Sequence, residues 1–233
     1  MTMLALSLLL LTLVAYQLSL MLYRHLNQPI YLHPTIVGCG AIAVILAITK
    51  VPYSDYFEAN QWIQFLLGPA TVALAIPLQQ QMANLRLLLV PLLITLPIGA
   101  LTAFASAILL ASGLGAEMDV LLSLSPKSVT TPIAMDLAEE LGGLPVLAAG
   151  VVAATGVFGA LVASPLFKLL NITDHRIQGF TMGVAAHAMG TARAFEISNQ
   201  CGAFASLGLG LTGLITAICL PYVAPAVLPL VSP

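Results

Sequence analysis

The chain has 233 residues, of which 60% are hydrophobic and only 7% are charged, and its formal net charge is −2. Soluble domains carry about 25% charged residues, so this composition excludes a soluble globular protein and predicts an integral membrane protein. At about 20 residues per helical span, the length allows about seven or eight segments. We therefore expect an all-α fold, a polytopic membrane helix bundle with interrupted helices.

The sequence indicates neither a cofactor nor a metal site. Cys39, Cys201 and Cys219 are scattered among apolar neighbours without a C-x-x-C pair, which favours buried thiols over metal or redox chemistry. The sequence contains no metal-ligand cluster, glycine-rich phosphate loop or basic nucleic-acid patch. No Ser-His-Asp or paired-carboxylate arrangement has convincing spacing. We expect no cofactor, no nucleic-acid partner and no enzymatic activity.

The first two segments are plain apolar runs. The first, about 3–23, precedes the first basic residue, Arg24, whereas a cleavable signal peptide has the reverse order. We expect a retained membrane helix there. The second segment runs from about Pro29 to Thr49, and a helix-start role suits His33 better than catalysis. Aromatic residues beside charges in the following loop indicate an interfacial belt.

Two further segments contain prolines. The third, about 61–82, is expected to be interrupted at Gly68 and Pro69, because proline removes a backbone donor and fixes φ. The fourth, 87–112, is long and apolar with two prolines as expected kinks.

The fifth segment, about 119–141, contains the most polar stretch of the apolar region. Pro126 and Pro132 must break the helix there, and in hydrocarbon the freed backbone groups need protein or a water-filled cavity. Thr131 suits a helix N-cap with Pro132 at the first helical position. Lys127, beside the N-terminus of that half-helix, predicts an anion site, to which Ser128, Thr130 and Thr131 would donate hydrogen bonds. The alternative is a lysine that extends to the membrane interface.

A second polar cluster lies in the seventh segment, about 177–197, between the small-residue segment 144–170 and the last segment, about 203–231. His187 and Thr191 share one helix face, and Gly190 is a further expected break. His187 is either a proton relay or a satisfied core histidine. Arg193 either holds a carboxylate or pairs with Glu196.

A weak internal repeat appears at an offset of 57 residues. Pro69 falls on Pro126 and Gly99 on Gly156, so repeat-like units of about 61–112 and 118–170 lie within one membrane domain, 1–233. Paired interruptions in corresponding positions indicate a transporter's substrate site.

The charges test which segments cross the membrane. If the fifth segment enters and returns on one face, the basic residues gather on the cytoplasmic side and the acidic residues outside. If all eight segments span, the basic residues divide between the two sides. The crossing count stays open. The basic residues are Arg24, Arg86, Lys168 and Arg176, and the acidic ones are Glu117, Asp119, Glu139 and Glu140.

Two stretches resemble the signatures of the LrgB/CidB family of membrane proteins. One is Ser125-Pro126-Lys127-Ser128-Val129-Thr130-Thr131-Pro132-Ile133-Ala134. The other is Gly183 to Arg193, with Ala186-His187-Ala188-Met189-Gly190-Thr191-Ala192-Arg193. The stretch from Pro69 to Ala75 also fits, so the resemblance extends over nearly the whole chain.

The resemblance implies two alternative functions in the bacterial cytoplasmic (inner) membrane. One is transport of small monocarboxylates of the pyruvate, glycolate or glycerate class, as for the related plastid glycolate/glycerate translocator. The other is antiholin-like modulation of murein hydrolase activity and autolysis, without a substrate. Both imply a small LrgA/CidA-like membrane partner. The resemblance also implies a distant similarity to cation/proton antiporter folds. Whether transport is coupled to protons or to sodium stays open, and so does the formation of a homo-oligomer.

Overall fold

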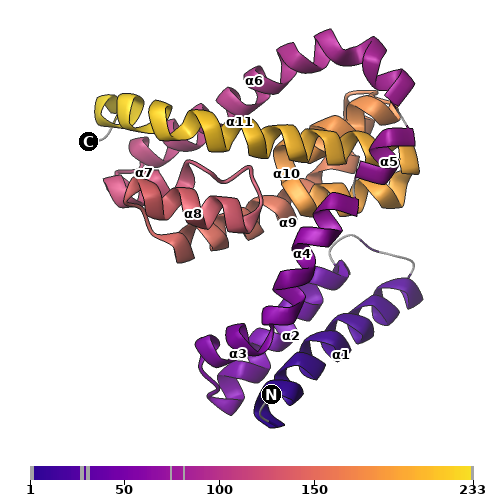
Figure 1. Cartoon of the computed structure of the whole chain (residues 1–233), viewed down its shortest axis with the longest axis vertical. Helices are drawn as coiled ribbons and strands as arrows, with labels where there is room; N and C mark the ends of the chain where they lie inside the picture. Colours follow the sequence, from indigo (N-terminus) through magenta and orange to yellow (C-terminus); the bar gives the residue numbers. More distant parts are fainter. Residues whose placement is uncertain (1–2, 27–28, 30–31, 74, 81, 232–233) are drawn as a thin grey trace. The chain divides into compact units, whose positions relative to one another are not determined.

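The computed structural model describes residues 3–26, 29, 32–73, 75–80 and 82–231, and this described part is helical without strands. The all-α prediction is confirmed. The chain forms two compact units, Met1–Ala73 and Leu74–Pro233, which are described separately (Figure 1). Among the described residues, four helices are long and apolar enough to cross a membrane. They cover Met3–His25, Val90–Gly113, Pro145–Leu169 and Asn199–Leu230.

The first unit contains α1 (Met3–His25), α2 (Pro34–Thr49), α3 (Tyr53–Ala59) and α4 (Gln61–Ala73). Helix α1 packs against α2 and α3. The Thr12 hydroxyl lies 2.8 Å from Asn60 Oδ1 and 2.9 Å from the Tyr56 hydroxyl. His33 is the N-cap of α2 and accepts a hydrogen bond from the Thr35 amide, so its expected helix-start role is confirmed.

Helix α4 corrects one expected break. It continues through Gly68 and Pro69, with the proline inside the helix. A proline removes one backbone hydrogen bond and bends a membrane helix, but neighbouring groups allow the helix to continue. The predicted structural break at Gly68 and Pro69 is therefore wrong.

The second unit contains α5 (Ala75–Gln80), the long helices α6 (Met82–Gly113), α9 (Pro145–Leu169) and α11 (Asn199–Val231), and the shorter α7 (Met118–Leu124), α8 (Thr131–Leu141) and α10 (His175–Ile197). Helices α6 and α11 run in the same direction. Leu92 near the start of α6 packs with Phe204, and Ile108 near its end packs with Leu220. Figure 1 shows α11 along this unit, with α7 and α8 toward one end and α10 toward the other.

Helices α7 and α8 form a hairpin, and α8 ends at the same end of the second unit at which α7 begins. The Leu144 amide, just after α8, donates to Ser123 Oγ of α7 at 2.7 Å. A side chain at Gly143 would begin 2.9 Å from the Ser123 amide nitrogen, so the chain after α8 lies against the last turn of α7. Met118 at the start of α7 and Leu141 at the end of α8 pack on the same core cluster. The interruption at 125–130 is the tip of this hairpin. Segment five therefore enters and returns on one face.

Helix α10 is a second hairpin rather than a straight span. Ala186 and His187 leave the helical region, and His187 has φ 41°. Ser198 Oγ lies 2.9 Å from His175 Nδ1 at the other end of the segment. A straight helix of this length would separate those ends by about 35 Å, at 1.5 Å per residue. The sequence left the crossing count open, and segment seven is not a straight span.

The reversal also explains Gly190. A side chain at Gly190 would begin 2.3 Å from the carbonyl oxygen of Met182, on the opposite arm of the hairpin. The break predicted at Gly190 lies instead at His187, and Gly190 is the small residue that lets the two arms touch.

The two hairpins enter from opposite ends of the second unit and meet beside the middle of α9. Val129, at the first tip, packs with Val152 of α9, and His187, at the second tip, lies 2.8 Å from the Val152 carbonyl oxygen. Each hairpin follows a long helix, and α6 and α9 run in opposite directions, so the pair has inverted topology. The interruption that corresponds to 125–130 in the other half of the repeat is therefore the break at His187, which follows Thr130 by 57 positions.

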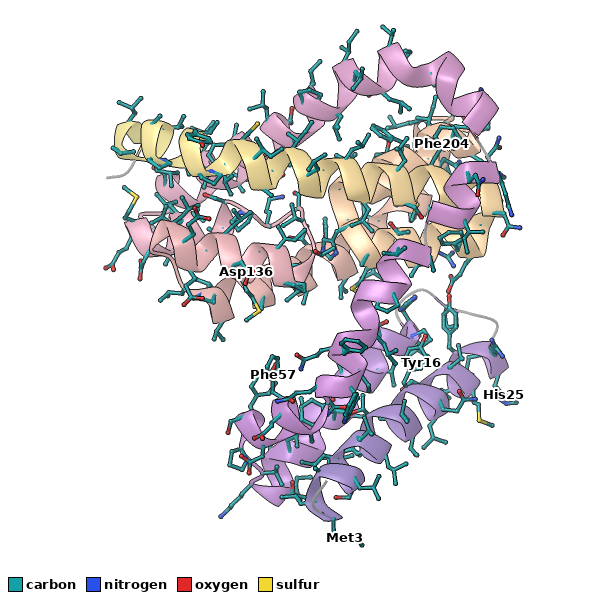
Figure 2. All side chains as sticks on the ribbon, viewed as in Figure 1. Met3, Tyr16, His25, Phe57, Asp136 and Phe204 are labelled. Atoms are coloured by element: carbon teal, nitrogen blue, oxygen red, sulfur yellow. The ribbon has the colours of Figure 1, made fainter. Side chains whose placement is uncertain are left out.

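The charges at the two ends of the second unit differ in sign. We call the end where α7 begins and α8 ends the acidic end, because it bears Glu117, Asp119, Glu139 and Glu140. The opposite end, where α9 ends and α10 begins, is the basic end, with Lys168 and Arg176. Figure 2 shows Asp136 on α8, in the acidic half, and Phe204 in the basic half. This separation agrees with the re-entrant alternative.

Candidate functional site

The candidate site is built around the tip of the first hairpin, residues 125–130. Pro126 and Val129 are buried and anchor the tip in the unit. The Ser125 hydroxyl donates to the Leu121 carbonyl at 2.8 Å and closes the last turn of α7. Thr130, not Thr131, is the N-cap of α8, because its carbonyl accepts the first helical bond from the Ala134 amide at 2.9 Å. Thr131 is the first helical residue and Pro132 the second, one position later than predicted.

Lys127 lines a cavity of about 510 Å³ between α9 and the first arm of α10. The lining is apolar except for Lys127 and the hydroxyls of Thr155 and Thr181. The lining residues of α9 extend from Ala154, beside the tip, to Phe167, near the basic end. The cavity therefore occupies the basic half of the unit with Lys127 at its inner end. Lys127 has no ion-pair partner among the described residues.

Ser128 borders a different cavity of about 220 Å³, between α6 and α11. Ser125, Thr212 and Thr216 add hydroxyls to a lining that is otherwise mostly apolar. The Ser128 and Thr212 hydroxyl oxygens are both buried and have no hydrogen-bond partner among the described residues. Leaving a buried hydroxyl unpaired costs about 1–3 kcal/mol, so this pair is a candidate ligand contact. The cavity extends to Leu220 and Val223, toward the acidic end.

His187 and Thr191 organise the tip of the second hairpin. His187 is only 4% exposed, and Nε2 lies 2.8 Å from the Val152 carbonyl. The Thr191 hydroxyl donates to the His187 carbonyl at 2.9 Å, which pairs one of the backbone groups freed at the break. A side chain at Gly156 would begin 2.6 Å from His187 Cε1, so the absence of a side chain there admits the imidazole. Neither residue lines the Lys127 cavity. This geometry favours the core-histidine alternative.

Arg193 lies on the second arm of α10 and forms an ion pair with Glu196, three residues later. Its side chain is 19% exposed, and it does not line the Lys127 cavity. The predicted seven-residue site is thus divided by the fold: Lys127 and Ser128 face different cavities, and Thr191 and Arg193 bond within the second hairpin. Thr130 and Thr131 begin α8.

The base of the second hairpin is also ordered by charge. The Asp174 carboxylate accepts from the Arg176 amide at 2.8 Å and caps α10. Hydrogen bonds from the Arg176 side chain to this carboxylate hold the pKa of Asp174 at about 2. The carboxylate therefore stays charged at neutral pH at the basic end.

Sequence reasoning missed Thr155, Thr181 and Thr212. Each is a single hydroxyl residue in an apolar helix, which normally satisfies itself by bonding to its own helix backbone. The unpaired Thr212 hydroxyl becomes evident only when α11 is packed beside Ser128. The described residues contain no group of three or more His, Cys, Asp or Glu side chains that would hold a metal.

Inverted re-entrant hairpins among apolar spanning helices define the class of this molecule as a polytopic membrane protein with interrupted helices. The family model that describes the LrgB-like family matches residues 12–226. The chain belongs to this family. No solved structure matches it.

Similar proteins match along almost their whole length. "Holin-like protein CidB" of Staphylococcus epidermidis is 30% identical over 93% of this chain and 94% of its own. An "uncharacterized protein" of Haemophilus influenzae is 33% identical over 91% of this chain and 92% of its own. The "uncharacterized protein YxaC" of Bacillus subtilis is 34% identical over 94% and 95%.

Proposed function

We propose that this protein is a secondary transporter of small monocarboxylates of the pyruvate, glycolate or glycerate class in the bacterial cytoplasmic membrane. The observation that carries the proposal is Lys127, which lies at the inner end of an apolar cavity beside a helix break and has no ion-pair partner in the described part of the chain. An ammonium at such depth is costly and is a mark of function in membrane proteins. A carboxylate bound there would compensate its charge.

The surrounding architecture supports transport rather than catalysis. Inverted repeats whose broken helices meet near the midplane are typical of secondary transporters, and substrates bind where the breaks meet. The hydroxyls of Thr155 and Thr181 line the cavity and would form hydrogen bonds with the oxo or hydroxyl oxygen on carbon 2 of the substrate, its 2-oxygen. His187 is bonded to α9 and would transmit movement of the second hairpin to the helix that lines the cavity.

The test is uptake of labelled pyruvate and glycolate into proteoliposomes by the full chain and by Lys127→Met. Losing a hydrogen bond to a charged group costs about 1.5–3 kcal/mol. Tenfold in affinity is 1.4 kcal/mol, so KM is expected to rise about 10- to 100-fold. Lys168→Met, an exposed lysine at the basic end, is the matched control and should transport normally. Equal uptake by Lys127→Met and wild type would show that Lys127 does not bind the substrate, and the proposed site would be wrong.

A second candidate function is favoured by the name of the staphylococcal relative, "Holin-like protein CidB". We infer that the alternative is antiholin-like modulation of murein hydrolase activity through a small LrgA/CidA-like membrane partner. Co-expression with that partner should then alter autolysis, and the effect should persist in Lys127→Met. If the lysis effect disappears together with uptake, transport is the primary function and lysis its consequence.

A further inference from the structure

Lys127 and Ser128 are consecutive residues, yet they border cavities on opposite sides of the hairpin tip. Lys127 lies at the inner end of the cavity in the basic half, which is bounded by α9 and α10. Ser128 lies at the inner end of the cavity in the acidic half, which is bounded by α6 and α11. The backbone of the tip therefore separates two recesses that extend toward opposite ends of the unit.

The recess in the acidic half has the chemistry of a binding site for a neutral polar group. The Ser128 and Thr212 hydroxyls come from different elements, are buried, and have no partner among the described residues. None of the described residues that line this recess is charged, so it suits an oxo or hydroxyl group better than a free ion. Its volume of about 220 Å³ exceeds the roughly 150 Å³ of a protein cavity that holds benzene.

We propose that Ser128 and Thr212 form a second subsite for a 2-oxo or 2-hydroxy carboxylate, reached from the acidic end, and that the tip is the barrier between it and Lys127. This inference rests on the proposed transport function. Both hydroxyl oxygens are closed off from the recess in this structure, so they bind the oxygen on carbon 2 of the acid when movement of the tip exposes them. The substrate passes from one recess to the other when the tip moves.

The experiment uses single cysteines in the full chain, with Cys39, Cys201 and Cys219 replaced by alanine. A membrane-impermeant maleimide is applied to vesicles of each orientation. Lys127→Cys is expected to be labelled from the basic end and Ser128→Cys from the acidic end, although they are adjacent. Thr155→Cys and Thr216→Cys test the same recesses without altering the tip. If Lys127→Cys and Ser128→Cys, or Thr155→Cys and Thr216→Cys, are both labelled from the same side, the tip is not a barrier between the two recesses.

The ligand is tested by protection of Thr216→Cys from labelling. Glycolate and pyruvate should protect, and acetate, which lacks the 2-oxygen, should protect far less. Thr212→Val should raise the half-protecting concentration of glycolate about 3- to 10-fold, the equivalent of one neutral hydrogen bond. Ser206→Ala removes a buried α11 hydroxyl that already bonds to the Gly202 carbonyl, and it should leave protection unchanged.

Equal protection by acetate, or no change with Thr212→Val, overturns the subsite. The labelling pattern does not require transport. If no carboxylate is taken up but adjacent cysteines are labelled from opposite sides, the transport function fails and the barrier stands. If uptake occurs but both cysteines are labelled from one side, the barrier fails and the transport function stands.

Discussion

At the scale of single residues, the fold depends on positions where two segments of the chain pack too closely to leave room for a side chain. His187 has a positive φ and is held by a hydrogen bond to the Val152 carbonyl oxygen. The imidazole occupies the space where a Gly156 side chain would lie. A strained, non-glycine backbone persists only where its surroundings fix it, so Gly156 and Val152 together determine the position of the second hairpin tip.

Gly156→Ala and Gly150→Ala provide a matched pair on α9. Both gain the same helix propensity, but an added Cβ at Gly150 has no atom within 4 Å, whereas at Gly156 it would overlap His187. We expect Gly156→Ala to be less stable than Gly150→Ala by about 1–3 kcal/mol, the usual cost of overpacking. Thermal unfolding of both variants in detergent measures the difference. Equal melting temperatures would show that the imidazole moves without penalty.

At the scale of elements, the second hairpin packs against α11 over glycines. A side chain at Gly179 or Gly183 would begin 2.0 Å from a carbonyl oxygen of α11, so the backbones are in direct contact, as small residues permit in membranes. This contact places the first arm of α10 along the start of α11. The hairpin thus enters and leaves at the basic end.

The hairpin predicts an internal crosslink. Cysteines at His175 and Ser198, in a chain without other cysteines, should be joined by a short bis-maleimide, because their side chains are in contact. Ser198→Cys paired with Leu144→Cys, at the acidic end, is the control and should not be joined. Mass spectrometry of the digested protein detects the product. If the thiols of the first pair both react but never join, α10 is a straight span.

At the scale of the whole molecule, charge determines how the second unit sits in the membrane. Basic residues favour the cytoplasmic side, and Lys168 and Arg176 lie at one end, whereas four carboxylates lie at the other. Because both hairpins return to their own end, α6, α9 and α11 are the only helices in the described part of this unit that carry the chain from one end to the other.

This arrangement predicts the sidedness of the loops. A cysteine at Gly142 should react with an impermeant maleimide from outside the cell, and a cysteine at Asn171 only from the cytoplasmic side. A cysteine at Asn199 should behave like the one at Asn171, since both ends of α10 lie at the basic end. Labelling of Asn199→Cys from outside would contradict the re-entrant hairpin.

Much of this protein is predictable from its sequence, for physical reasons. A chain with so few charges can satisfy its backbone in lipid only as helices, so the helical class and the spans near 3–23, 144–170 and 203–231 follow from composition. The break at Pro126 and Pro132 follows from proline geometry. Charge placement favours a re-entrant fifth segment.

The path of the chain at His187 was decided only by tertiary structure. No proline or glycine occupies the reversal itself, at Ala186 and His187, because packing against Val152 and Gly156 imposes it. The sequence repeat therefore assigned the partner of the 125–130 break to Pro69, although α4 runs through that proline. Lys127 and Ser128 border separate cavities because different helices pack on each side of the tip, which is also decided by the tertiary structure. Local sequence determines where a helix must break, and only the surrounding helices determine what each side of the break faces.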